Sequence, residues 1–292
     1  MERLSDVSCQ VGESPTWHAA EGAWYWVDIP QRRVWRLDAS SGATRFWSTD
    51  EMVACVVPRS DGGLIAGMES GIFALELGDA EAALQRKLAA PASGLDAGMR
   101  FNDGRCDRQG RFWSGTMFMD MAAARAVGQL YRYDAQRGLS APVVSELLTQ
   151  NGLAFSPDGR TMYLSDSHPQ RRMVWAFDYD TDAGVPSKRR VFADMTSFAG
   201  RPDGAAIDTD GCYWVCGNDD GCVLRFAPDG KLDRRVDVPM LKPAMCAFGG
   251  KNLDTLMVTS IISGKPEDAQ WGGAVVLLQP GAQGVAETLF AA

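Results

Sequence analysis

The chain has 292 residues, of which 46% are hydrophobic and 23% charged, a composition typical of a globular protein with a large core. Its 37 acidic and 29 basic residues give a net charge of −8, which argues against attraction to a phosphate backbone. Its apolar runs are far shorter than the roughly 18 residues that span a bilayer, and its first residues lack the apolar stretch of a signal peptide. We therefore expect a cytoplasmic protein that binds neither nucleic acid nor membrane.

The cysteines, histidines and common nucleotide-binding motifs exclude several classes of enzyme. The seven cysteines form no CxxC pair, so we expect reduced, buried thiols. Only His18 and His168 are present, which argues against a histidine-rich zinc site or a histidine triad. The chain also lacks the glycine-rich signatures of nucleotide-binding enzymes and the G-x-S-x-G of nucleophile-elbow hydrolases.

From the N-terminus onward, short apolar segments with alternating patterns occur in pairs, and each pair indicates two antiparallel strands joined by a turn. The six pairs are residues 22–28 and 33–38, 63–67 and 71–75, 110–115 and 128–134, 156–166 and 174–178, 210–215 and 223–226, and 256–260 and 273–278. A turn glycine lies at or near the start of each pair, at spacings of 39 to 52 residues: Gly22, Gly62, Gly110, Gly159, Gly211 and Gly250.

This repeat length predicts an all-β protein, a six-bladed β-propeller in one domain spanning residues 1–292. The nearest candidate for a helix, residues 79–88, is short, which disfavours a doubly wound α/β fold.

Polar residues occur where the innermost strand of a blade is expected to begin. The four segments are Gly12-Glu13-Ser14-Pro15, Arg100-Phe101-Asn102-Asp103-Gly104, Gln150-Asn151-Gly152-Leu153 and Arg201-Pro202-Asp203-Gly204. Each resembles an ordinary turn when taken alone. In a propeller, however, we expect the equivalent loops to converge at one end of the central channel. Glu13, Asn102, Asn151 and Asp203 would then form an all-oxygen group suited to a hard divalent cation.

The same segments carry a family resemblance. Together with Val27-Asp28-Ile29, Gly115-Thr116-Met117 and Cys246-Ala247-Phe248-Gly249-Gly250, they resemble the SMP-30/gluconolactonase (regucalcin-like) family in order and spacing. The similarity runs from about residue 9 to residue 280. It implies a six-bladed propeller that hydrolyses sugar lactones with one divalent metal ion in its channel.

Carried over to this chain, the resemblance implies that Glu13, Asn151 and Asp203 are metal ligands and that Asp203 is also the proton acceptor. Arg100 and Asn102 match positions that contact the substrate. A further substrate-contacting acid, a glutamate in better-known members, falls on Asp120 here. The shorter acid, with Phe118 and Met119 before it, suggests a different sugar. An oxygen-only site accommodates Ca²⁺, Mg²⁺, Mn²⁺, Zn²⁺ or Fe²⁺, and the sequence does not choose among them.

Three other functions stay open at this point. A non-catalytic calcium-binding regulator would bind metal without turnover. An interaction scaffold is a common role of propellers, although the WD40 signature is missing. An esterase or phosphotriesterase would need a mainly apolar pocket, whereas Arg100, Asn102 and Asp120 favour a substrate rich in hydroxyl groups. We expect a monomer whose partner is a small sugar lactone, and the role of His168 is left open.

Overall fold

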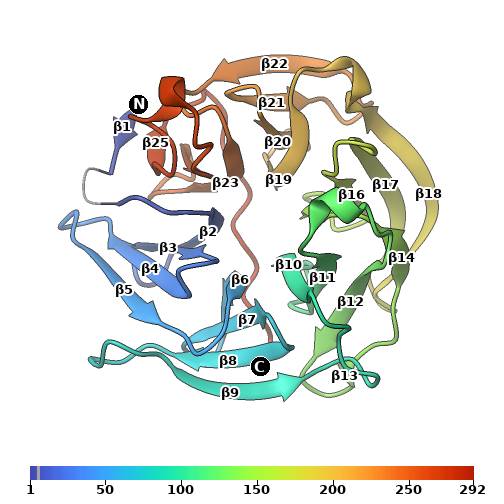
Figure 1. Cartoon of the computed structure of the whole chain (residues 1–292). Coiled ribbons are helices and arrows are strands. Elements are labelled where there is room, and N and C mark those ends of the chain that lie inside the picture. Colours follow the sequence, from blue (N-terminus) through green and yellow to red (C-terminus); the bar gives the residue numbers. More distant parts are fainter. Residues whose placement is uncertain (5–6) are drawn as a thin grey trace.

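The structure of the chain, a computed structural model, describes residues 1–4 and 7–292. Six antiparallel sheets stand around a common axis, and each sheet turns one edge strand toward the centre (Figure 1). The chain is therefore a six-bladed β-propeller, as the repeat predicts.

The blades follow one another in chain order around the ring. Within each blade, the first strand named below is the innermost one. Blade 1 contains β2 (Gly12–His18), β3 (Ala23–Asp28), β4 (Arg33–Asp38) and β5 (Thr44–Ser48). Blade 2 contains β6 (Val53–Pro58), β7 (Leu64–Met68), β8 (Ile72–Glu76) and β9 (Leu84–Ala89). Blade 3 contains β10 (Met99–Cys106), β11 (Phe112–Phe118), β12 (Gly128–Asp134), β13 (Gly138–Leu139) and β14 (Val144–Leu147).

The second half of the ring repeats this plan. Blade 4 contains β15 (Gln150–Phe155), β16 (Thr161–Asp166), β17 (Met173–Asp180) and β18 (Val185–Asp194). Blade 5 contains β19 (Arg201–Ile207), β20 (Tyr213–Asn218), β21 (Cys222–Phe226) and β22 (Leu232–Asp237). Blade 6 contains β23 (Pro243–Gly249), β24 (Thr255–Ser260), β25 (Val276–Leu278) and β1 (Glu2–Arg3). Short 3₁₀ turns are η1 (Met121–Ala123), η2 (Met195–Ser197) and η3 (Pro266–Asp268).

The strand pairs predicted from the sequence are the second and third strands of the blades. All six anchor glycines have a positive φ, between 58° and 99°, the backbone region in which glycine carries no steric penalty. The short helix candidate at residues 79–88 is not helical, since Leu84–Ala89 form the strand β9.

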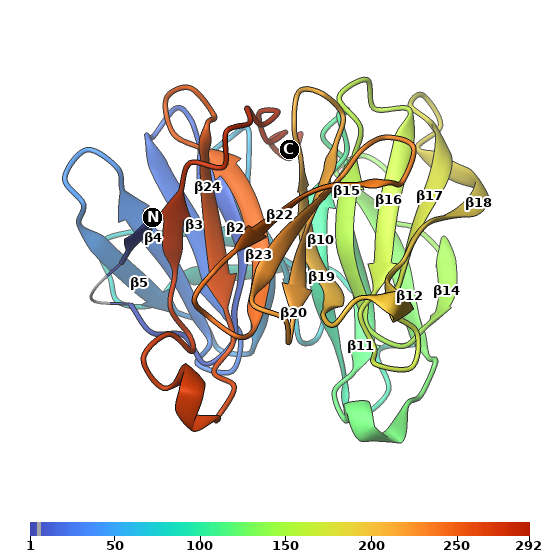
Figure 2. The ribbon, with the colours of Figure 1, turned by 90° about the horizontal axis from the view of Figure 1, so that it is seen from above.

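Two terminal segments close the ring. β1 pairs with β25, so the start of the chain supplies the outermost strand of the last blade. The C-terminal segment, residues 279–292, crosses one end of the channel (Figure 1). It bonds to the ends of inner strands: Val285 N–H donates to Ile207 O at 3.3 Å and Phe290 N–H to Pro58 O at 2.9 Å. Figure 2 shows this segment at one end of the ring and the η1 and η3 turns at the other.

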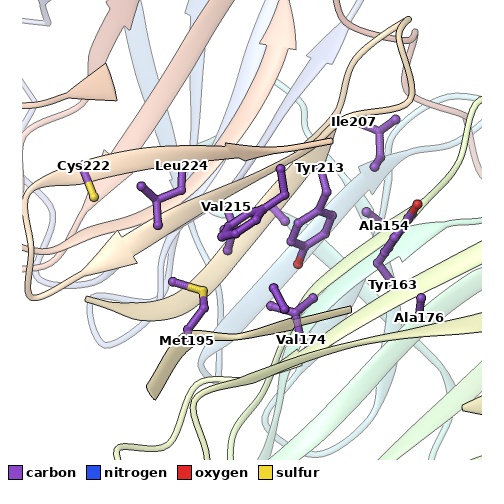
Figure 3. Close-up of a cluster of buried hydrophobic side chains, with 13 residues drawn as sticks. Ala154, Tyr163, Val174, Ala176, Met195, Ile207, Tyr213, Val215, Cys222 and Leu224 are labelled. Carbon is purple, nitrogen blue, oxygen red and sulfur yellow. The ribbon is translucent and has the colours of Figure 1, made fainter. Parts of the chain in front are cut away.

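Apolar side chains fill the spaces between blades. Between blades 4 and 5, for example, Tyr163, Val174, Tyr213 and Val215 belong to one buried cluster (Figure 3). The rings of Tyr163 and Tyr213 lie 5.2 Å apart between centroids. The seven cysteines are buried and free, as expected. No helix within residues 1–4 and 7–292 is long and apolar enough to cross a membrane.

Each inner strand has a β-bulge close to its start. The pairing register shifts between Glu13 and Thr16 in β2, and between Asn151 and Ala154 in β15. Equivalent shifts interrupt β6, β10, β19 and β23. A bulge bends a strand and re-aims its side chains, and bulges are common next to active sites. The polar segments that the sequence analysis assigned to loops are therefore the irregular first residues of the inner strands themselves.

Candidate functional site

Glu13, Asn151 and Asp203 stand near the start of β2, β15 and β19, with Asp203 one residue further along its strand than the other two. All inner strands run the same way along the channel, so these side chains lie at one end of it, which we call the site mouth. The opposite end, crossed by the C-terminal segment, is the far mouth. The three residues are 7%, 4% and 5% exposed. Polar groups this deeply buried need partners, which makes their hydrogen bonds informative.

Asp203 is oriented by a chain of hydrogen bonds from blade 5. Asn218 Nδ2 donates to Asp203 Oδ2 at 2.7 Å, and Arg201 Nη2 donates to Asn218 Oδ1 at 2.9 Å. Arg201 also pairs with Asp219, with Nε 2.7 Å from Oδ2. Asn218 can face Asp203 because β20 returns antiparallel beside β19 and ends at the site mouth. This arrangement fixes one carboxylate oxygen of Asp203.

Asn151 is oriented by the neighbouring hairpin of blade 4. Its Nδ2 donates to Ser167 Oγ at 3.0 Å, while its buried Oδ1 has no hydrogen-bond partner among the described residues. Gly152, which follows it, has φ +57°, and an added Cβ would lie 2.4 Å from the Tyr213 hydroxyl oxygen. Only glycine fits this bulge, because Tyr213 of β20 and the Asp203 carbonyl oxygen of β19 both approach it closely.

Glu13 belongs to the most strained of these strand starts. Ser14, the next residue, has φ 53° and is held by β6: its Oγ accepts a hydrogen bond from Val56 N–H at 2.9 Å. Burial raises the pKa of Glu13 well above its ordinary range, and the nearby charges of Asp203 and Asp103 raise it further. Burial also raises the pKa of Asp203 to about 7, although Arg201 and Asn218 oppose this. Two carboxylates thus share one poorly solvated space.

Arg100 and Asn102 from β10 complete the same region. Arg100 Nη1 donates to Asn102 Oδ1 at 2.6 Å and to Phe101 O at 2.8 Å. Asn102 Nδ2 donates in turn to Gln150 O at 2.7 Å. Burial lowers the pKa of Arg100 to about 10, so it stays charged at neutral pH, and Glu13 and Asp203 favour that charge. The Asn102 amide is therefore occupied in holding Arg100 against β15.

Asp120 lies at the same mouth but apart from this buried group. It is exposed, and its Oδ1 accepts the Ala122 N–H at 3.1 Å, so it caps the η1 turn. His168, whose role the sequence leaves open, is buried at 3% exposure, and its Nε2 lies 2.9 Å from Met121 O. The structure thus gathers five of the six predicted site residues and leaves Asp120 on the surface beside them.

Several polar residues of the site escaped sequence reasoning. Ser167 and Asn218 position predicted residues, but their places follow only from strand register. Arg201, which orients Asn218, stands in a quoted motif but was given no role. Asp103 was quoted within its motif without a role. It is 4% exposed, its Oδ2 accepts the Leu153 N–H at 2.8 Å, and its buried Oδ1 is unpartnered. For Asn218, the sequence offered one signal: a polar residue at the end of an otherwise mostly apolar strand, β20.

The site has the donors that a hard divalent cation requires. The donor atoms are all oxygens: the carboxylates of Glu13 and Asp203 and the unpartnered Asn151 Oδ1. A cation would relieve the repulsion between the two carboxylates. Within the described part of the chain, no three His, Cys, Asp or Glu side chains are grouped to hold a metal ion. A cation at the site mouth would therefore need the amide oxygen of Asn151 as well as two carboxylates.

Comparison with known proteins gives one consistent family. A family model described as SMP-30/Gluconolactonase/LRE-like region matches residues 11–262. A 6-deoxy-6-sulfogluconolactonase of Pseudomonas putida is 38% identical over 286 residues, which cover 96% of this chain and 95% of that protein. A pentonolactonase of Haloferax volcanii is 35% identical over 259 residues, 88% of this chain and 84% of the relative.

Among solved structures, regucalcin of Agrobacterium tumefaciens, described as a calcium-binding protein, matches with a TM-score of 0.91 at 27% identity. The match covers 100% of this chain and 98% of regucalcin. With the motif set, the bulged inner strands and the family match in agreement, the chain belongs to the SMP-30/gluconolactonase/LRE-like family.

Proposed function

We propose that this protein hydrolyses the ring ester of an aldonolactone to the aldonic acid, with one divalent cation bound by Glu13, Asn151 and Asp203. The observation that carries the proposal is a group of buried oxygens at the site mouth: the carboxylates of Glu13 and Asp203 and the unpartnered Asn151 Oδ1. The guanidinium of Arg100, held by Asn102, lies in the same region. Two relatives named as lactonases, at 38% and 35% identity, support the reaction class.

Each residue has a part in this proposal. A bound divalent cation supplies a Lewis acid that polarises the ester carbonyl and acidifies water. Asp203 accepts the proton from the attacking water: Asn218 donates to one of its oxygens and orients the carboxylate, whose remaining lone pairs serve the cation and the water. The new C–O bond forms as the ring C–O bond breaks, and the proton on Asp203 passes to the departing ring oxygen. Arg100, held by Asn102, binds hydroxyl groups of the sugar.

Proton release from a panel of lactones tests the proposal. Chelator-stripped protein receives γ- and δ-lactones of five- and six-carbon aldonic acids, including a 6-sulfo derivative, with Ca²⁺, Mg²⁺, Mn²⁺, Zn²⁺ or Fe²⁺ restored singly. An aryl ester and an aryl phosphotriester serve as comparison substrates. We expect metal-dependent acid release with an aldonolactone. Metal binding without turnover would favour a regulatory protein, and faster turnover of the aryl compounds would favour an esterase or phosphotriesterase.

A further inference from the structure

The connection between β11 and β12, residues 119–127, lies at the site mouth and is weakly held. β11 ends beside the start of β10, since Phe118 pairs with Met99. The connection carries the exposed Asp120 and the η1 turn, which buries no residue. Its remaining bonds are local: Met119 N–H donates to Gly98 O at 2.8 Å, and the Arg125 guanidinium lies 4.3 Å from the centroid of the Phe118 ring. A single 3₁₀ turn of this kind has little stability of its own.

One hydrogen bond joins this connection to another blade. Within the described part of the chain, residues 119–127 form hydrogen bonds only within blade 3, apart from Met121 O, which lies 2.9 Å from His168 Nε2. His168 Nδ1 accepts the Gln170 N–H at 3.2 Å, so the proton of the neutral ring is on Nε2 and is donated to Met121. The ring is buried, so this bond is shielded from competing water.

The turn that carries His168 also holds the site. Ser167 Oγ accepts from Asn151 Nδ2, and Ser167 O accepts from Arg201 Nη1 at 2.9 Å. Asp166 fixes the turn, since its carboxylate accepts the Leu148 and Thr149 N–H groups at 2.8 and 3.0 Å. His168 is therefore anchored to the same hairpin as the proposed cation site, and it reaches from there to the connection.

We propose that His168 is a positioning residue that selects among lactones by docking the Asp120-bearing connection against blade 4. The inference rests on the proposed lactonase function. Without the His168 bond, the described hydrogen bonds of residues 119–127 all lie within blade 3. Sugar binding must then also order the connection, so the loss falls mainly on KM and differs between lactones of different length.

The test compares His168→Ala with the conservative His168→Gln, whose amide N–H can reach the Met121 carbonyl. His18→Ala is the matched control, because the other histidine lies at the end of β2, at the far mouth. Three readouts are made: kcat and KM across the lactone panel, affinity for Mn²⁺ by titration calorimetry, and the rate of tryptic cleavage after Arg125, which is exposed in the connection.

We expect His168→Ala to raise KM about tenfold, unequally across the lactones, the size expected for one lost buried hydrogen bond. Both kcat and Mn²⁺ affinity should change little, and cleavage after Arg125 should accelerate. His168→Gln should restore most of KM and of the protection, and His18→Ala should match the wild-type protein.

Unchanged or uniformly raised KM values, or equal effects of the alanine and glutamine variants, would overturn the specificity role. Unchanged cleavage after Arg125 would overturn the docking itself. If the wild-type protein hydrolyses no lactone, the proposed function fails and the specificity role fails with it. The cleavage rates would still show separately whether His168 holds the connection.

Discussion

Both mouths of the channel bury acidic side chains, but the two mouths differ in how the buried oxygens are hydrogen-bonded. At the far mouth, Asp208 is 1% exposed, yet both its oxygens are used: Oδ1 accepts the Cys212 N–H at 2.9 Å, and Oδ2 accepts from Trp214 Nε1 and Arg225 Nε at 2.8 Å. At the site mouth, Asn151 Oδ1 has no partner among the described residues, and burial raises the pKa values of Glu13 and Asp203. Burial alone therefore does not distinguish the two mouths, whereas the unpartnered amide oxygen beside two carboxylates of raised pKa does.

The C-terminal segment extends the comparison. Arg105 Nη1 lies 2.7 Å from Glu287 Oε1, and its Nη2 donates to Ala205 O at 2.7 Å, so the segment's acid pairs with a buried guanidinium of β10. Arg108 adds a bond from Nη1 to Ala286 O at 3.2 Å. Paired charges and satisfied backbone groups make the far mouth a structural closure and leave the site mouth for chemistry.

The largest expected contrast is between Asp203, near the start of β19, and Asp208, the residue directly after the end of that strand. Asp203→Asn should lower kcat by about 10³-fold, because an amide cannot accept the proton from water. The metal-free variant should be at least as stable as the wild-type protein, since one of two repelling carboxylates is gone. Steady-state kinetics and urea unfolding measure the two effects. Retention of most of the lactonase rate would remove Asp203 from the proposed mechanism.

Asp208→Asn should have the opposite effects: a lower free energy of unfolding and a nearly unchanged kcat. The new amide nitrogen faces donors at Trp214 and Arg225, and Arg225 loses a buried counter-charge, so we expect a loss of about 3 kcal/mol of unfolding free energy. The value of kcat should stay within about twofold, because the far mouth takes no part in the reaction. The same unfolding curves, followed by fluorescence and by circular dichroism, test the expectation of one domain, which requires a single coincident transition.

Glu287→Ala should have a smaller effect, about 2 kcal/mol, since it leaves Arg105 buried but still bonded to Ala205 O. Glu287→Gln keeps a hydrogen-bond acceptor for Arg105 and is the matched control. Chemical unfolding at neutral pH measures both variants. A stability equal to that of the wild-type protein in Glu287→Ala would show that the C-terminal segment does not secure the far mouth.

The pH dependence of the metal-free protein is the subtlest prediction. The pKa of Asp203 is raised to about 7 in the folded protein, against about 3.9 in an unfolded chain. The folded state therefore favours the protonated acid, and stability should fall as pH rises from about 4 through about 7. Melting temperatures with a chelator present, compared between the wild-type protein and Asp203→Asn, measure this slope. Equal slopes would contradict the raised pKa.

The fold could be predicted because the second and third strands of each blade are joined by local turns with glycines at fixed places. The outer strands were harder to predict. β9 and β22 are largely exposed and lack a clear apolar alternation. The pairing of β1 with β25 and the course of residues 279–292 depend on contacts between distant parts of the chain, which no local pattern records.

The site was predictable to a similar degree. Glu13, Asn151 and Asp203 interrupt buried strands with oxygen-bearing side chains, and their places near the start of inner strands bring them to one mouth. The bulges that aim them follow from close approaches such as that of Gly152 to Tyr213, which depend on the packed ring. Ser167 and Asn218 depend on register across neighbouring strands. Asp120 lies in a connection that is hydrogen-bonded to another blade through Met121, and no local sequence pattern records that contact.

The account depends most on the identity of the cation-binding oxygens, and a crystal of the protein soaked in Mn²⁺ tests this directly. An anomalous difference map should show one strong peak at the site mouth, within bonding distance of Glu13, Asn151 Oδ1 and Asp203. A strong peak elsewhere with none among these three side chains, or no peak at a Mn²⁺ concentration that saturates the protein in solution, would contradict the account.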